Sequence, residues 1–274
     1  MLGRTIAAEF FKASRRWGLL FWGFVFVPIY SVVVDVVLQL NSIHLDGVVP
    51  RIDLFARLAR ALEGSSSPIA QVFFIVAAAT IFGGEYDSQN WRVLAPRARR
   101  TDWILAKVLL YGAGAFVSLA LMALGATFIA LLGAVRLREP ILWQAPVDSP
   151  LSAMVMLFAI SWLELLLLGL TTGLIAVVSR SVLVGAISLI LAAFCQTFLS
   201  SQVTASVSSI PLLAALPGLC ADVARFFVTR TEISPGEYIA ARSALVAGAS
   251  LLVWTSLTLC LTLAWFRQQQ FNRE

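Results

Sequence analysis

Long apolar segments limit this chain to very few folds. The sequence of 274 residues is 59% hydrophobic and only 13% charged, whereas soluble domains are closer to a quarter charged. Runs of about 20 apolar residues are long enough to cross a hydrocarbon core of roughly 30 Å. A membrane β-barrel would instead show short alternating segments. We therefore predict an all-α polytopic membrane protein, a single transmembrane domain over residues 1–274, with spans at 17–40, 68–84, 103–135, 151–179, 182–200 and 242–266.

Two segments outside these spans have the periodicity of amphipathic helices. In residues 1–16, Leu2, Ile6 and Phe10 share one face, and basic residues occupy the other. This pattern predicts a helix lying in the membrane interface, although a cytosolic start that only obeys the positive-inside rule is the alternative. A second such helix is expected after the first span, where Phe55 and Leu62 fall on one face, as an interfacial helix on the opposite side of the membrane.

The distribution of charge predicts the orientation. The start of the chain, the segment between spans two and three, Arg180 and the C-terminal tail together hold more than twice as many basic as acidic residues. The remaining loops are balanced, so the positive-inside rule places both termini in the cytoplasm. This bias also explains the net charge of +5 without nucleic acid as a partner. Residues 201–241, which are interrupted by Pro211 and Pro217, are expected to form an outer or re-entrant element.

The inner segment 85–102 belongs to the only long polar segment that is tightly flanked by apolar spans on both sides. Its cations alone can be explained as topology signals, but Trp91 and Leu94 among them are not needed for topology. A helix with apolar side chains beside arginines is suited to a groove on a soluble partner. We therefore interpret 85–102 as a docking loop.

Three features resemble the membrane (permease) subunit of bacterial ABC exporters of the ABC-2 type. They are the start RTIAAEFFKASRRW, the Glu85-Tyr86 pair that opens the inner loop, and the run WRVLAPR at 91–97 followed by Arg99-Arg100 and Lys107. The sequence differs from the family pattern at Gln89-Asn90, where small residues are usual. The resemblance implies a coupling helix in 85–102 that contacts a nucleotide-binding subunit through Glu85, Tyr86, Trp91, Arg92, Leu94, Pro96, Arg97 and Arg100.

The same resemblance implies a dimer, either of this chain or with a related permease subunit, in the bacterial cytoplasmic (inner) membrane. It also implies that ATP and Mg are bound by the partner subunit. A P-loop requires Gly-Lys, but Lys12 follows Phe11 and Lys107 follows Ala106, so we expect no ATPase activity, catalytic residue or cofactor in this chain. One histidine and three scattered cysteines predict no metal site. Membrane lipid is the remaining expected partner.

Two features of the fourth span leave alternatives open. Glu164 lies in its middle, where a carboxylate costs about 3 kcal/mol on insertion scales and must face protein or water. It is either a pathway or gating residue, or a buried ion or hydrogen-bond partner. The glycines of GLTTG at 169–173 suit close helix packing, at a subunit interface or within the chain. The alternatives to an exporter permease are a secondary carrier or channel, and a membrane scaffold.

Overall fold

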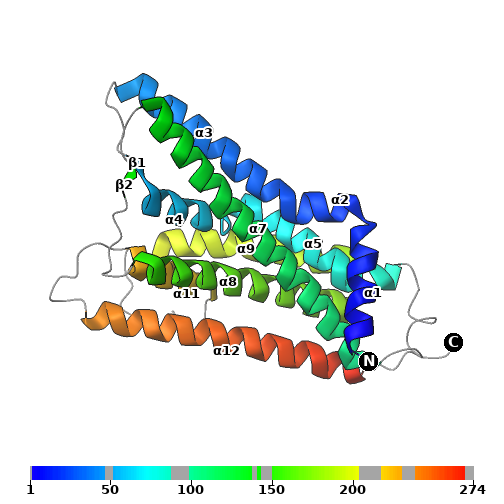
Figure 1. The fold of residues 1–274 in the computed structure, drawn as a ribbon. Coiled ribbons are helices and arrows are strands. Elements are labelled where there is room, and N and C mark those ends of the chain that lie inside the picture. The colour runs from blue at the N-terminus through cyan, green and yellow to red at the C-terminus, as the bar shows by residue number, and fades with distance from the viewer. Residues whose placement is uncertain are drawn as a thin grey trace.

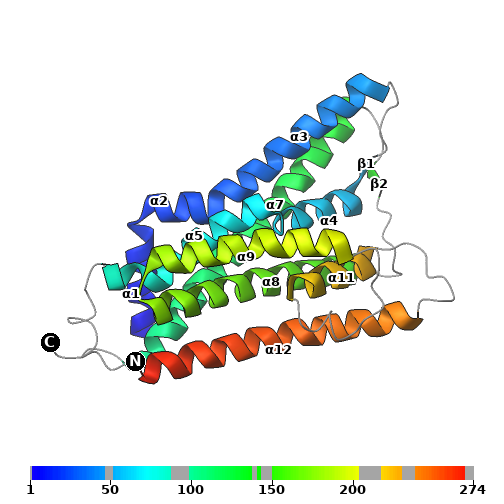
Figure 2. The same cartoon turned by 180° about the vertical axis from the view of Figure 1, so that it is seen from behind.

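The computed structural model describes residues 2–46, 52–87, 99–137, 141–142, 150–203, 217–229 and 238–268, and these form an elongated helical bundle (Figures 1 and 2). In chain order the elements are α1 (Leu2–Ser14), α2 (Trp17–Leu20), the π-helical turn η1 (Phe21–Val25), α3 (Phe26–Asp46), β1 (Ile52–Asp53), α4 (Leu54–Gly64), α5 (Pro68–Asp87), α7 (Arg100–Leu137), β2 (Ile141–Leu142), α8 (Pro150–Ser179), α9 (Val182–Val203), α11 (Pro217–Thr229) and α12 (Tyr238–Gln268).

Within the described residues, five helical segments are long and apolar enough to cross a membrane. They are Trp17–Leu38, Pro68–Tyr86, Thr101–Arg136, Leu151–Ser179 and Leu245–Gln268. A further apolar helix, Val182–Phe198, is shorter. The prediction of an all-α multi-pass membrane protein is therefore confirmed, and the spanning helices are recovered close to the predicted ranges.

Several predicted boundaries shift. Helix α5 continues to Asp87 and α7 begins at Arg100, so both ends of the predicted loop 85–102 are helical. Helix α12 begins at Tyr238, before the predicted start at 242. Polar side chains mark where a helix leaves an apolar environment, but they do not stop the helix, and Asp102 in the first turn of α7 favours its start by facing the helix dipole.

The termini of the helices gather at two ends of the bundle. One end, here called the N-terminal end, holds α1, the last turn of α5, the first turn of α7, the α8–α9 turn and the last turn of α12 (Figures 1 and 2). The α8–α9 turn is tight, with Arg180 in the left-handed region at φ 56°. The opposite end, here called the far end, holds α4, α11 and the short parallel pair β1–β2, in which Ile52 lies beside Ile141 (Figure 1).

Helices α1 and α4, which were both predicted to lie in the membrane interface, pack differently from what their apolar faces predict. Helix α1 buries Thr5, Glu9 and Ala13, whereas Phe10 is 40% exposed. Leu2 and Ile6 are partly buried, so the predicted apolar face is only partly open, and a neighbouring face of small and polar side chains is the one buried. Helix α4 is the reverse: its predicted apolar face is buried against α7 and α8, with Leu62 only 1% exposed, so this segment is part of the core and not a second interfacial helix.

The glycines of GLTTG pack within the chain. A side chain at Gly169 would overlap the buried ring of Tyr111 from α7, and one at Gly173 would overlap Phe82 from α5. Tyr111 also donates a hydrogen bond of 3.0 Å to the carbonyl oxygen of Leu165. These contacts support the intrachain alternative for the motif, because both glycines are occupied by neighbouring helices of the same subunit.

Candidate functional site

A buried carboxylate joins three helices at the N-terminal end. The two oxygens of Glu85, in α5, contact the Nζ of Lys12 from α1 at 2.5 Å and the Nζ of Lys107 from α7 at 2.7 Å. The side chains of Glu85 and Lys107 are 2% and 0% exposed, and that of Lys12 is 33% exposed. Lys107 also donates a hydrogen bond of 2.6 Å to the Ile81 carbonyl. Its buried ammonium group therefore contacts both a carboxylate and a backbone oxygen.

Glu9 adds a second carboxyl group to this cluster. It lies on the face of α1 that packs against the bundle and is 6% exposed. Burial raises the pKa of the Glu9 carboxyl, the charge of Lys107 opposes this shift, and the charge of Glu85 reinforces it. The cluster therefore places two carboxyl groups between two lysines, where α1 meets the ends of α5 and α7.

Three of the eight predicted partner-contact residues lie in the described part of the chain. Glu85 is buried and ion-paired inside the chain, so its carboxylate is not presented at the surface. Tyr86 is partly buried against the cluster of Trp103 and Phe266. The backbone of Arg100 forms the first residue of α7. The remaining five lie outside the described residues: Trp91, Arg92, Leu94, Pro96 and Arg97.

The sequence analysis did not assign Glu9 and Lys12 to this site. The acid and the lysine three residues later were noted only as part of the N-terminal resemblance. The pairing of Lys12 with Glu85, 73 residues away, has no local signature. The available signal was the position of Lys107, a single charge inside an otherwise apolar stretch that must find a buried partner.

A second buried ion pair lies inside the bundle. Glu164 of α8 accepts hydrogen bonds from Arg225 of α11 and, at 3.3 Å, from the side-chain amide of Gln71 in α5. Arg225, which is 2% exposed, also donates to Ser161 at 3.4 Å and to Asp222 at 3.3 Å. This geometry agrees with the alternative in which Glu164 is a buried ion partner. A role in a transport pathway stays a prediction.

Asp222 connects this pair to the surface of the far end. Its side chain is half exposed, and it lies three residues before Arg225 on α11. Partial burial and the neighbouring charge of Glu164 raise the pKa of Asp222 to about 6, and Arg225 opposes the shift. Arg225 is thus shared between a buried carboxylate and a carboxyl group that titrates in a mildly acidic range.

Neither arrangement resembles a site for metal-assisted chemistry. Within the described parts of the chain, no three His, Cys, Asp or Glu side chains come together in a way that could hold a metal ion. Both clusters instead pair acids with bases between helices that are distant in sequence, which fixes the relative positions of those helices.

Comparisons with known proteins gave no match: no protein-family model and no curated protein is significantly similar to this chain.

Proposed function

We propose that the chain is the permease subunit of an ATP-driven ABC exporter in a bacterial cytoplasmic membrane. In this proposal α9 supplies a sixth span, both termini are cytoplasmic, and the N-terminal end of the bundle faces the cytoplasm. A separate nucleotide-binding subunit binds and hydrolyses ATP with Mg. Two permease subunits, identical or related, enclose the export path, and this chain carries neither a catalytic residue nor a cofactor.

The observation that supports this proposal best is the ion-paired cluster of Glu85, Lys107 and Lys12. Glu85 lies in the last turn of α5, before the inner loop, and Lys107 lies near the start of α7, after it. A buried pair at 2.7 Å holds these two helices together, and Lys12 connects α1 to them. A partner that moves the loop would therefore displace α5, α7 and α1 as one unit, as a subunit driven by an outside ATPase requires.

The contact with the partner is proposed for the residues between these two helices. Apolar and basic side chains alternate there, and this combination is suited to a groove on a soluble protein. In this refined form Glu85 positions the loop from inside and does not touch the partner. The contact itself is made by Trp91, Arg92, Leu94, Pro96, Arg97 and Arg100, with Tyr86 at its edge.

Co-purification with charge-reversal variants tests the proposal. The tagged chain is expressed with a candidate nucleotide-binding subunit from the same genome, as wild type, R92E, R97E and the control R136E. Arg136 is an exposed arginine at the far end of α7, so its reversal changes net charge equally without touching the loop. We expect R92E and R97E to lower recovery of the ATPase at least tenfold, a change of about 1.4 kcal/mol, and R136E to retain it. Equal recovery with all three variants, or no ATPase with wild type, would refute the docking role.

One observation favours a secondary carrier instead. Ionisable side chains buried inside spanning helices, such as Glu164 of α8 with its partner Arg225 from α11, occur in the pathways of carriers and pumps. A carrier would move its cargo along an ion gradient after reconstitution of the purified chain alone. The exporter proposal predicts no transport in that experiment until the ATPase subunit and ATP are added.

A further inference from the structure

We propose that the groove between α1, α2, α5 and α7 binds the phosphate of an anionic phospholipid. The groove shares Glu9 and Lys12 with the ion-paired cluster, and it contains about 260 Å³ of empty space, including the part open to the surroundings. Its floor is apolar and includes Ala13, Ile81 and Leu110. This inference depends on the membrane character of the chain and on the proposed cytoplasmic orientation of its N-terminal end, but not on the proposed ATPase partner.

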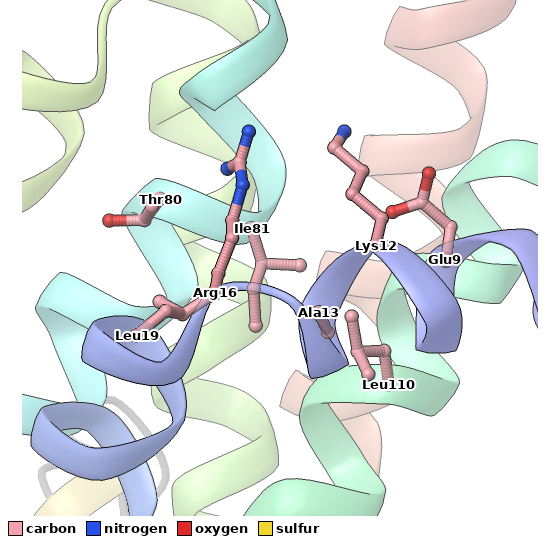
Figure 3. A pocket seen from close by; sticks show the side chains of 8 residues that line it. All are labelled: Glu9, Lys12, Ala13, Arg16, Leu19, Thr80, Ile81 and Leu110. Atoms are coloured by element: carbon pink, nitrogen blue, oxygen red, sulfur yellow. The ribbon is translucent and has the colours of Figure 1, made fainter.

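Two cations stand at the rim of the groove. Figure 3 shows Arg16 and Lys12 on either side of Ile81, with the ends of both side chains pointing the same way. Lys12 is already paired with Glu85, but Arg16 makes no ion pair with any residue in the described part of the chain. Glu9 lines the same groove, and the charges of Lys12 and Arg16 act on its carboxyl group, whose pKa is raised by burial. Arg16 therefore supplies a cation that forms no ion pair among the described residues, beside apolar side chains.

The turn between α1 and α2 places Arg16 in this position. The chain bends sharply there, as Figure 1 shows, and Arg16 adopts φ −102° and ψ 67° between the two helices. Its Nη1 lies beside Gly84 of α5: a β-carbon built at Gly84 would be 3.6 Å from it. The absence of a side chain at Gly84 keeps the space next to the guanidinium open.

The surroundings indicate a lipid as the source of the phosphate. Trp17, 79% exposed, follows Arg16 directly, and Trp22, 53% exposed, lies about one turn further along. Exposed tryptophans at the end of a spanning helix mark the level of the lipid headgroups. Basic pockets between membrane helices at the cytoplasmic side bind anionic headgroups. At this depth, a phosphate with an attached acyl chain meets both the cations and the apolar floor.

Lipid titration of the purified full chain tests the site. The delipidated protein in detergent is titrated with phosphatidylglycerol or phosphatidylcholine, and native mass spectrometry measures the bound fraction. We expect wild type to prefer phosphatidylglycerol, and R16Q to bind it about fivefold more weakly, the factor that one basic side chain contributes at an anionic surface. Binding of phosphatidylcholine should not change.

R15Q is the matched control. Arg15 is the neighbouring residue, carries the same charge and lies over the ring of Phe11 at 4.6 Å, outside the groove. T80L provides a second variant: Thr80 lines the groove, and its hydroxyl bonds only within its own helix, to the Val76 carbonyl at 2.7 Å. The larger side chain should weaken phosphatidylglycerol binding as R16Q does, without a change of charge.

Three outcomes would overturn the proposal. They are a wild type without preference between the two lipids, an equal loss with R15Q and R16Q, and displacement of phosphatidylglycerol by inorganic phosphate at matched ionic strength, which would identify a site for soluble phosphate. Because R16Q should still recover the ATPase subunit, failure of this inference is distinguishable from failure of the proposed function.

Discussion

Replacing Lys107 with methionine is the sharpest test of the ion-paired cluster. Methionine keeps the chain length and the apolar stem of lysine but removes the charge that faces Glu85. The Glu85 carboxylate has two lysine partners, and they differ in exposure: the side chain of Lys107 is 0% exposed, and that of Lys12 is 33% exposed. Replacing each lysine in turn therefore compares a fully buried partner of Glu85 with a partner that water reaches.

The two partners should contribute very different free energies. Removing one member of a buried ion pair lowers the free energy of unfolding by 3–5 kcal/mol, because the remaining charge stays buried. Since Lys12 still faces Glu85 in K107M, we expect the lower limit, about 3 kcal/mol. A pair with a water-exposed member contributes roughly 1 kcal/mol or less, which is the expected loss for K12M. The double variant E85Q/K107M leaves no buried charge without a partner at this position and should recover more than about 1 kcal/mol relative to K107M.

Equilibrium unfolding in mixed micelles with increasing sodium dodecyl sulfate measures these differences. Far-UV circular dichroism follows the helices, and wild type, K12M, K107M and E85Q/K107M are compared at one pH. A loss below about 1 kcal/mol for K107M, or equal losses for K12M and K107M, would refute the assignment of the buried pair as the main connection between α5 and α7.

Two further predictions use the same assay. The folded state favours the protonated form of Asp222, whose pKa of about 6 lies above the ordinary 3.8. The stability that this group contributes is thus fully present below about pH 4 and is lost as the pH rises through about 6. D222N should therefore gain stability relative to wild type across that interval, and parallel pH profiles would contradict this. G169A should lose about 1–3 kcal/mol because its methyl group overlaps a buried aromatic ring, whereas G248A, which meets nothing within 4 Å, should be neutral or up to about 1 kcal/mol more stable. Equal effects of the two alanines would show that the ring moves aside freely.

The spans were predictable because the membrane imposes a length on each apolar run. The start of the first spanning segment at Trp17 and the start of α5 at Pro68 agree with the sequence analysis, since a proline is favoured in the first turn of a helix. The helix ends beyond the apolar runs were missed. Nothing in a hydropathy pattern indicates that Arg100–Asp102 continue the helix of α7 into water, because helix formation there depends on the backbone and on caps.

The candidate site was predictable only in part. The resemblance selected Glu85 and Lys107, but as a partner contact and the end of a motif, not as a pair. Hydrophobic periodicity predicted that α1 is amphipathic with Leu2, Ile6 and Phe10 on one face, yet the residues it buries against the bundle are Thr5, Glu9 and Ala13. A buried lysine and glutamate on neighbouring helices make a polar face the preferred contact, and this reversal depends on residues far away in the sequence.

The two charged clusters have one structural feature in common: in each, an ion pair attaches a short helix to a spanning helix. Lys12 attaches α1 to α5 through Glu85, and Arg225 attaches α11 to α8 through Glu164. Apolar contacts alone cannot do this in a membrane, because lipid tails are as apolar as the side chains that they replace. Lipid tails cannot replace the partner of a charge in a low-dielectric interior. Short helices that are attached by ion pairs are therefore held in their positions. If Glu164 takes part in transport, it must therefore act through Arg225 and the movement of α11.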